Sequence, residues 1–137
     1  MKIVLDTNVL VSGLLNPYGS PGQIVTLVAA GELSICFDSR ILGEYRDVLL
    51  RPKFGFQVRH VEALLEQIHA AGKSVSALPL SRPLPDRDDE PFLEVALTAS
   101  TDYLVTGNHR HYPTNLAADV QVMTPAKFMA IYRTRHE

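Results

Sequence analysis

Short apolar runs alternate along the chain with longer stretches in which apolar residues recur at helical spacing. The short runs predict strands over residues 2–5, 33–37, 103–106 and 120–123, and a short edge strand over residues 74–78. The longer stretches predict helices over residues 7–15, 23–30, 40–50, 57–71, 92–99 and 125–133. Strands that alternate with helices in this way predict an α/β fold with a mainly parallel sheet.

Turn-forming and capping residues mark the ends of these elements. Asp38 with Ser39, and Thr124 with Pro125, have the residue types that begin helices, and Gly31 and Gly72 have the type that ends them. The segments over residues 16–22, 79–91 and 107–113 are rich in turn formers or polar residues and are predicted to be loops.

The position of Asp6 directly after the first predicted strand is a candidate functional feature. Sites in open parallel sheets form beyond the carboxyl ends of the strands, and Thr106, Gly107 and Asn108 follow another strand in the same way. Asp6 has a second explanation, because Asp is also a common N-cap residue and a helix begins at residue 7.

Glu44 lies at the edge of the apolar face of the helix predicted over residues 40–50, whereas Asp47 lies well away from it. An acid at this edge can point into a cleft between helix and sheet. The alternative is an ordinary surface glutamate without a structural role.

Asp86, Asp88, Asp89 and Glu90 crowd into the start of the helix predicted at residue 92. Capping of the helix N-terminus accounts for one acid but not for four within five residues, which repel one another unless a cation or a basic partner is near. Glu94 falls on the side of this helix opposite to its apolar residues and is predicted to be solvated.

Asp6, Glu44 and one acid of residues 86–90 together form a set of hard oxygen ligands. Mg²⁺ or Mn²⁺ suits such a set, with water completing the coordination. His109 and His111 are spaced for a loop and are predicted to contact phosphate or solvent rather than zinc.

The composition limits the function class only broadly. The chain has 137 residues, which fits a single domain over residues 1–137, and 13 Lys and Arg against 15 Asp and Glu give a net charge of −2. This charge argues against nucleic-acid binding by bulk charge alone. No stretch approaches the roughly 18 apolar residues of a membrane-spanning helix, and the single Cys36 suits a reducing cytoplasm.

Three segments resemble the PIN-domain ribonucleases, most closely the toxin components of bacterial toxin–antitoxin systems. They are MKIVLDTNVLVSGLL, SRILGEYRDVLLRPKF and LPDRDDEPFLEVALTASTDYLVTGNHRHYP. The resemblance implies a three-layer α/β/α sandwich around a mainly parallel sheet, with RNA cleavage that depends on Mg²⁺ or Mn²⁺. It also implies a cytoplasmic protein with RNA as substrate, a small antitoxin as partner, and a homodimer.

By the same resemblance, Asp6, Glu44 and Asp89 match the catalytic, metal-binding acids of the family. Asp86 competes with Asp89 for the third position. Asn108 stands where the family commonly has a fourth acid. An asparagine can still coordinate or orient a water, but it removes one negative charge and so weakens the case for a second metal ion.

Other residues match supporting positions of the family. Asn8, Ser12 and Thr106 match polar positions that support the acids, and Arg87 and Arg110 are predicted to hold RNA phosphates.

Three other classes compete with this interpretation. A two-Asp phosphatase needs a second Asp where Asn8 stands, and a receiver domain needs a phosphoacceptor that Asp38 matches poorly. A degenerate PIN domain that binds RNA or a protein partner without cleaving is the strongest rival, because Asn108 removes one acid.

Overall fold

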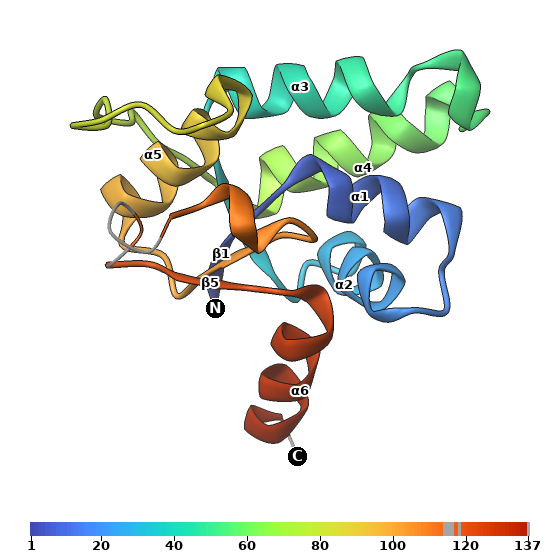
Figure 1. Ribbon diagram of the computed structural model, residues 1–137. Helices are drawn as coiled ribbons and strands as arrows, with labels where there is room; N and C mark the ends of the chain where they lie inside the picture. Colours follow the sequence, from blue (N-terminus) through green and yellow to red (C-terminus); the bar gives the residue numbers. More distant parts are fainter. Residues whose placement is uncertain (114–116, 118, 137) are drawn as a thin grey trace.

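A computed structural model describes residues 1–113, 117 and 119–136 of the protein (Figure 1). Its sheet has the strand order β3-β2-β1-β4-β5, and every neighbouring pair is parallel. The strands are β1 (Lys2–Leu5), β2 (Ser34–Phe37), β3 (Lys73–Ser74), β4 (Tyr103–Val105) and β5 (Gln121–Met123). The predicted α/β fold with a parallel sheet is confirmed.

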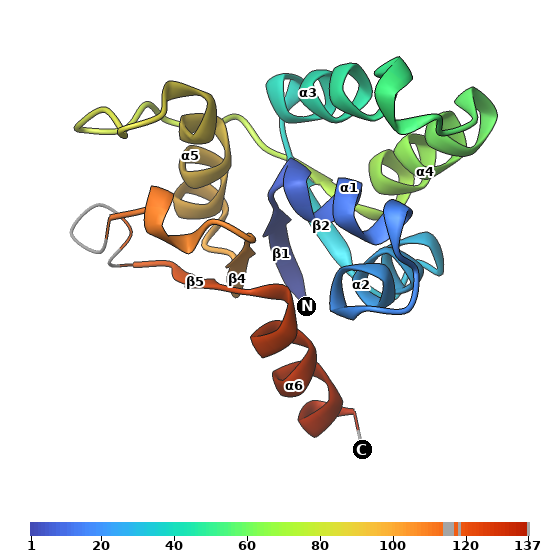
Figure 2. The same cartoon turned by 45° about the vertical axis from the view of Figure 1, so that its right-hand side comes forward.

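Helices cover both faces of the sheet. They are α1 (Thr7–Leu15), α2 (Ser20–Ala29), α3 (Ser39–Leu49), α4 (Val58–Ala71), α5 (Glu90–Ala99) and α6 (Pro125–Arg135), with short 3₁₀ turns at Pro52–Phe54, Arg87–Asp89 and His109–His111. Figure 2 shows α5 on one side of β1 and β2, and α1 and α2 on the other. The predicted three-layer arrangement is confirmed.

The central strand β1 holds the middle of the core. Ile3, Val4 and Leu5 are fully buried, as expected for a strand covered by helices on both faces. Tyr45 reaches from α3 into this core, and its hydroxyl donates a hydrogen bond to the carbonyl oxygen of Leu5. This contact fixes α3 against the end of β1.

The predicted helix caps are confirmed at two positions. The Asp38 side chain accepts a hydrogen bond from the Ile41 N–H at 3.0 Å, and the Thr124 hydroxyl accepts one from the Lys127 N–H at 3.2 Å. Both caps satisfy free N–H groups in the first turn.

Two predicted boundaries differ from the structure by three residues or more, and α5 and α6 each extend two residues beyond their predicted ends. The edge strand predicted over residues 74–78 is only Lys73–Ser74, because its partner β2 ends at Phe37 and the last ladder contact is the Val75 N–H to the Phe37 carbonyl at 2.8 Å. Helix α2 begins at Ser20 and not at residue 23, since a Pro in the first turn needs no N–H partner. Among the described residues no helix is long and apolar enough to cross a membrane.

Close packing between α1 and α2 generates a stability prediction. A Cβ on Gly13 would lie 2.6 Å from both the Pro21 carbonyl oxygen and a Val25 methyl group, whereas a Cβ on Gly43 in α3 would meet nothing within 4 Å. We expect Gly13→Ala to lower the free energy of unfolding by about 1–3 kcal/mol through overpacking. Gly43→Ala is the matched control and should raise it by up to about 1 kcal/mol. Urea denaturation measures both, and equal effects would contradict the packing argument.

Candidate active site

The carboxyl ends of β1 and β4 lie side by side where the order of the strands reverses. The chain builds the sheet outward from β1 through β2 to β3, and then returns to place β4 and β5 on the other side of β1. Ligands bind at such switch points in open α/β sheets. Asp6 directly follows β1, and Thr106 directly follows β4.

Asp6 is buried at this point, with 6% of its surface exposed. Its Oδ2 accepts hydrogen bonds from the Thr106 hydroxyl at 2.7 Å and from the Tyr112 hydroxyl at 3.3 Å. Burial raises the pKa of Asp6, and these hydrogen bonds oppose the rise. Asp6 occupies the N-cap position of α1, but its side chain makes no capping hydrogen bond to the helix, so capping does not explain where the carboxylate points.

Glu44 reaches from α3 to the first residue of α1. Its carboxylate accepts a hydrogen bond from the hydroxyl of Thr7, which is buried and follows Asp6 in the chain. Burial raises the pKa of Glu44, the Thr7 hydrogen bond lowers it, and the negative charge of Asp6 raises it further. The interpretation of Glu44 as an ordinary surface residue is therefore wrong.

Asp89 lies directly before α5 and is 8% exposed. Burial, and after it the negative charges of Asp6 and Asp86, raise the pKa of Asp89 to about 6, whereas His111 lowers it. The Asp89 Oδ2 lies 3.1 Å from the His111 Nδ1. The electrostatic effect of Asp6 on both Glu44 and Asp89 places the three carboxylates in one region.

Tyr112 connects the acids through side-chain contacts. Its buried side chain donates a hydrogen bond to Asp6, and the residue before it, His111, contacts Asp89. Thr7, which follows Asp6, contacts Glu44. These contacts bring the three predicted acids together.

Both candidates for the third acid lie at the same place. Asp86, Asp89 and His111 each offer one ligand atom within 4.8 Å of the others. Asp89 is the buried one, whereas Asp86 is exposed and its Oδ1 accepts the Asp88 N–H at 2.9 Å.

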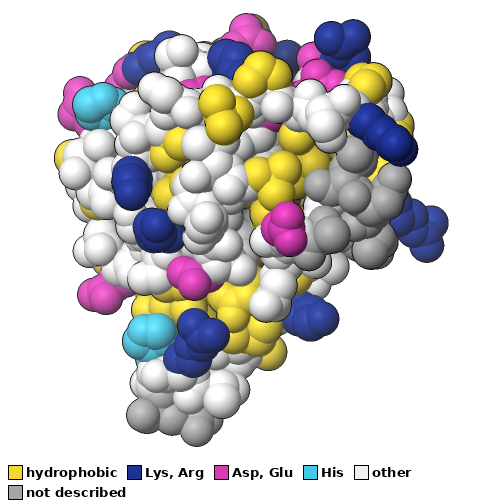
Figure 3. Space-filling view, turned by 90° about the vertical axis from the view of Figure 1, so that its left-hand side faces the viewer, with side chains coloured by type: hydrophobic (Ala, Val, Ile, Leu, Met, Phe, Trp, Pro, Cys, Tyr) yellow, Lys and Arg dark blue, Asp and Glu magenta, His cyan; other side chains and the backbone are white. Residues whose placement is uncertain are grey.

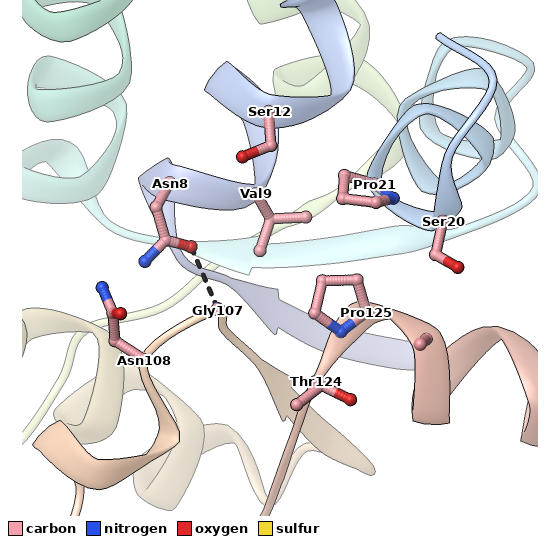
Figure 4. Close-up of a pocket in the computed structure, with 10 residues that line it drawn as sticks. Asn8, Val9, Ser12, Ser20, Pro21, Gly107, Asn108, Thr124 and Pro125 are labelled. Atoms are coloured by element: carbon pink, nitrogen blue, oxygen red, sulfur yellow. Dashed lines mark hydrogen bonds between the residues drawn. The ribbon is translucent and has the colours of Figure 1, made fainter. Parts of the chain in front are cut away.

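Asn8, Ser12 and Asn108 line a neighbouring hollow of about 570 Å³ at the same edge of the sheet (Figure 4). The Asn8 Oδ1 accepts the Gly107 N–H at 3.1 Å, and the amide groups of Asn8 and Asn108 face one another. The lining side chains are all uncharged. The hollow is therefore a neutral surface beside the acidic cluster.

The structure corrects one prediction on α5. Glu94 was predicted to be solvated, but it is only 8% exposed. Its carboxylate accepts hydrogen bonds from the Arg40 guanidinium at 2.7 Å and from the Leu80 N–H at 2.9 Å. The segment around Leu80 and the side chain of Arg40 cover the outer side of α5, which the pattern within α5 alone does not reveal.

Comparison with known proteins agrees with this geometry. The family model of the PIN domain matches residues 2–110, which include every acid of the cluster. The chain belongs to the PIN domain family. PIN domains are generally nucleases and typically use divalent metals.

One relative and one solved structure resemble this PIN domain over most of its length. Uncharacterized protein MJ1680 of Methanocaldococcus jannaschii is 29% identical over 140 residues, which cover 94% of this chain and 90% of that protein. The crystal structure of VapBC2 from Rickettsia felis, bound to a DNA fragment from their promoter, has a chain that matches with a TM-score of 0.56 and 16% identity. The match covers 90% of this chain and 98% of that chain, and it supports the fold.

The acids of this PIN domain fit a divalent cation. Asp6 and Asp89 are buried, and burial raises the pKa values of both carboxyl groups while the charge of Asp6 adds to the rise at Asp89. A bound cation would compensate both the lost hydration and the repulsion. Carboxylate oxygens are the donors that Mg²⁺ and Mn²⁺ prefer.

The predicted phosphate contacts of the PIN domain lie at its surface. Arg87 is 81% exposed in its side chain and lies 3.4 Å from Glu90, and Arg110 is exposed. On the face seen in Figure 3, Lys and Arg side chains are scattered among acidic ones and form no continuous basic patch. The mixture of charges on this face agrees with the small net charge of the chain.

Sequence reasoning missed three residues that contact the acids, namely Thr7, His111 and Tyr112. His111 was predicted to contact phosphate or solvent, but it contacts Asp89. The feature of the sequence that could have identified these three residues is that they lie close to Asp6 or Thr106 along the chain. The side chain of His109 lies outside the described part of the structure.

The raised pKa of Asp89 predicts how the stability of the metal-free PIN domain depends on pH. A folded-state pKa of about 6, above the ordinary value of 3.8, means that the folded protein holds this proton more tightly than the unfolded chain. The free energy of unfolding should therefore fall as pH rises from 4 to about 6, by on the order of 1 kcal/mol after solvent screening. Denaturation with a chelator present measures it, and Asp89→Asn should lose this part of the pH dependence. Parallel curves for the two proteins would contradict the assignment.

Proposed function

We propose that this PIN domain is a divalent-metal-dependent endoribonuclease and the toxin of a toxin–antitoxin pair. The observation that carries the proposal is the convergence of Asp6, Glu44 and Asp89 at the switch point of a parallel sheet, where burial and mutual repulsion disfavour their ionised forms. Without a bound cation, burying these carboxyl groups lowers the stability of the folded protein. A cation-binding function therefore explains the arrangement better than a structural role does.

Asp6, Glu44 and Asp89 would hold Mg²⁺ or Mn²⁺. When bound, the ion would stabilise charge on the scissile phosphate and lower the pKa of the attacking water. The Thr106 and Tyr112 hydroxyls orient the Asp6 carboxylate through their hydrogen bonds to Oδ2.

Glu44 would hold the ion through a water molecule or accept the proton of that water. Burial and the charge of Asp6 raise the pKa of Glu44, which moves it toward the range in which a carboxylate can act as a general base. The Thr7 hydroxyl holds the Glu44 carboxylate toward Asp6.

RNA would lie across the acidic cluster and the neutral hollow. Arg87 and Arg110 would contact the flanking phosphates because both side chains are exposed, and Arg87 would exchange its 3.4 Å contact with Glu90 for one with a phosphate. Asn8, Ser12 and Asn108 present amides and a hydroxyl beside the cluster and would contact the neutral parts of a nucleotide.

A second candidate function is binding of RNA or of a protein partner without cleavage. Asn108 favours it, because the position where the family commonly has an acid carries an uncharged amide that faces Asn8. Metal-dependent cleavage of RNA by the purified protein separates the two functions.

We infer a small antitoxin as partner and activity in the cytoplasm. The fold is shared with a chain of VapBC2, which was crystallised with promoter DNA, and this supports the proposal of a toxin–antitoxin pair. The proposed homodimer rests on the family resemblance. Most apolar residues of α2 and α4 are buried in the chain's own core, and Val58 of α4 is exposed.

Asp6→Asn tests the catalytic assignment. The substitution keeps the shape of the side chain and its ability to accept from Thr106 but removes its charge, so cleavage of RNA with Mn²⁺ should fall by about 10²- to 10³-fold. The melting temperature should not fall, because a buried charge is removed. Asp47→Asn, an exposed acid on α3, is the control and should cleave normally. Full activity of Asp6→Asn would refute the assignment.

Metal binding should stabilise the protein. Mn²⁺ at ten times its dissociation constant should add about 1.4 kcal/mol by mass action and raise the melting temperature by about 5 °C. The rise should shrink in Glu44→Gln and persist in Glu66→Gln, an exposed glutamate of α4. An unchanged melting temperature of the wild type in millimolar Mn²⁺ would favour the second candidate function.

A further inference from the structure

The segment that follows β4 contributes residues first to the neutral hollow and then to the acidic cluster. Asn108 faces the neutral hollow, and the His111 N–H then donates to the Asn108 carbonyl at 2.9 Å and closes a 3₁₀ turn. This turn reverses the chain, so that His111 returns to Asp89 and Tyr112 returns to Asp6. The same segment therefore brings an uncharged amide to the hollow and an imidazole to the acids.

We propose that His111 is a metal ligand that forms, with Asp86 and Asp89, a mixed nitrogen and oxygen site. This site supplies a donor in place of the acid missing at Asn108. The proposal deepens the proposed function, since it rests on the metal dependence stated there. Its basis is that one ligand atom of each of the three residues lies within 4.8 Å of the other two.

The distances within this site match coordination. The Asp89 Oδ2 lies 3.1 Å from the His111 Nδ1. Two ligands on neighbouring corners of an octahedron, each about 2.1 Å from the ion, lie about 3.0 Å apart. The same two atoms can therefore share a proton in the metal-free protein and share an ion in the loaded one.

Each of the three residues has a reason to bind. Burial and the charges of Asp6 and Asp86 act against the ionised form of Asp89, so a cation there relieves both. Asp86 uses Oδ1 to accept the Asp88 N–H, which orients its carboxylate and leaves Oδ2 for another partner. The His111 ring is half exposed, so the site is open to an ion from solvent.

An imidazole in the site changes which ion is preferred. Mg²⁺ prefers oxygen donors and keeps its water, whereas transition ions accept nitrogen donors more readily. The site should therefore favour Mn²⁺ over Mg²⁺, which a purely carboxylate site does less strongly. The expected preference for Mn²⁺ over Mg²⁺ therefore depends on the nitrogen donor of His111 and not on the carboxylates of Asp6 or Glu44.

Pulsed electron paramagnetic resonance of the Mn²⁺-loaded full chain without RNA tests the ligand directly. The wild type should show coupling of the manganese electrons to a nitrogen nucleus. The coupling should vanish in His111→Asn, which can still hydrogen-bond to Asp89, and persist in His60→Asn, an exposed histidine of α4. A wild type with no nitrogen coupling, or a coupling that survives in His111→Asn, would overturn the proposal.

Isothermal titration of Mn²⁺ and Mg²⁺ tests the selectivity. His111→Asn should weaken Mn²⁺ binding by at least about tenfold and Mg²⁺ binding much less. His111→Asp should retain binding and bring the two dissociation constants closer together. An equal loss for both ions would mean that His111 acts only through Asp89, and no loss would mean that it contacts phosphate instead. Either result would overturn the proposal.

These outcomes are separate from those of the cleavage experiments. A protein that binds Mn²⁺ with nitrogen coupling but does not cut RNA would support the site and refute the nuclease proposal. A protein that cuts RNA without nitrogen coupling would refute the site alone.

Discussion

The burial of three carboxyl groups close to one another, those of Asp6, Glu44 and Asp89, is the constraint around which the rest of the site is organised. Burial acts against the ionised form of each carboxyl group, and the charge of Asp6 makes the other two harder to ionise. The fold keeps them together because each has a hydrogen-bonding partner close by. Hydroxyl groups serve the first two acids and the imidazole of His111 serves the third.

The parallel sheet brings these acids together from distant parts of the chain. All strands point the same way, so every carboxyl end lies at one edge, and the reversal of strand order places β1 beside β4 at its centre. Helix α3 is fixed to the end of β1 by Tyr45, which directs Glu44 toward Asp6. The start of α5 brings Asp89 from the other side.

The edge of the sheet is divided into a charged part and a neutral part. The acids lie on one side, and the hollow with Asn8 and Asn108 lies on the other. Thr106 stands between them, because its hydroxyl donates to Asp6 and accepts the Asn108 N–H at 3.0 Å. A nucleotide offers both kinds of group, a charged phosphate and an uncharged base and sugar, so this division suits a nucleic-acid substrate.

Local pattern in the sequence determined most elements of the fold. The apolar run before Asp6 marks a buried strand, and the caps at Asp38 and Thr124 mark helix starts, because strand alternation, helical spacing and capping all depend on near neighbours. The same pattern placed Asp6 and Thr106 at strand ends. It failed at the edge strand, whose length depends on where its partner β2 ends.

Only the tertiary structure decided which polar groups share the site. Glu94 looks solvated from the spacing of α5 but is covered by Arg40 and the chain at Leu80. The resemblance favours Asp89 over Asp86 as the third acid, and only the tertiary structure shows that Asp89 is the buried one of the two. His111 reaches an acid 22 residues away because a 3₁₀ turn reverses the chain. Such contacts join residues far apart in sequence, so they follow from how the helices and loops pack on the sheet and not from any local pattern.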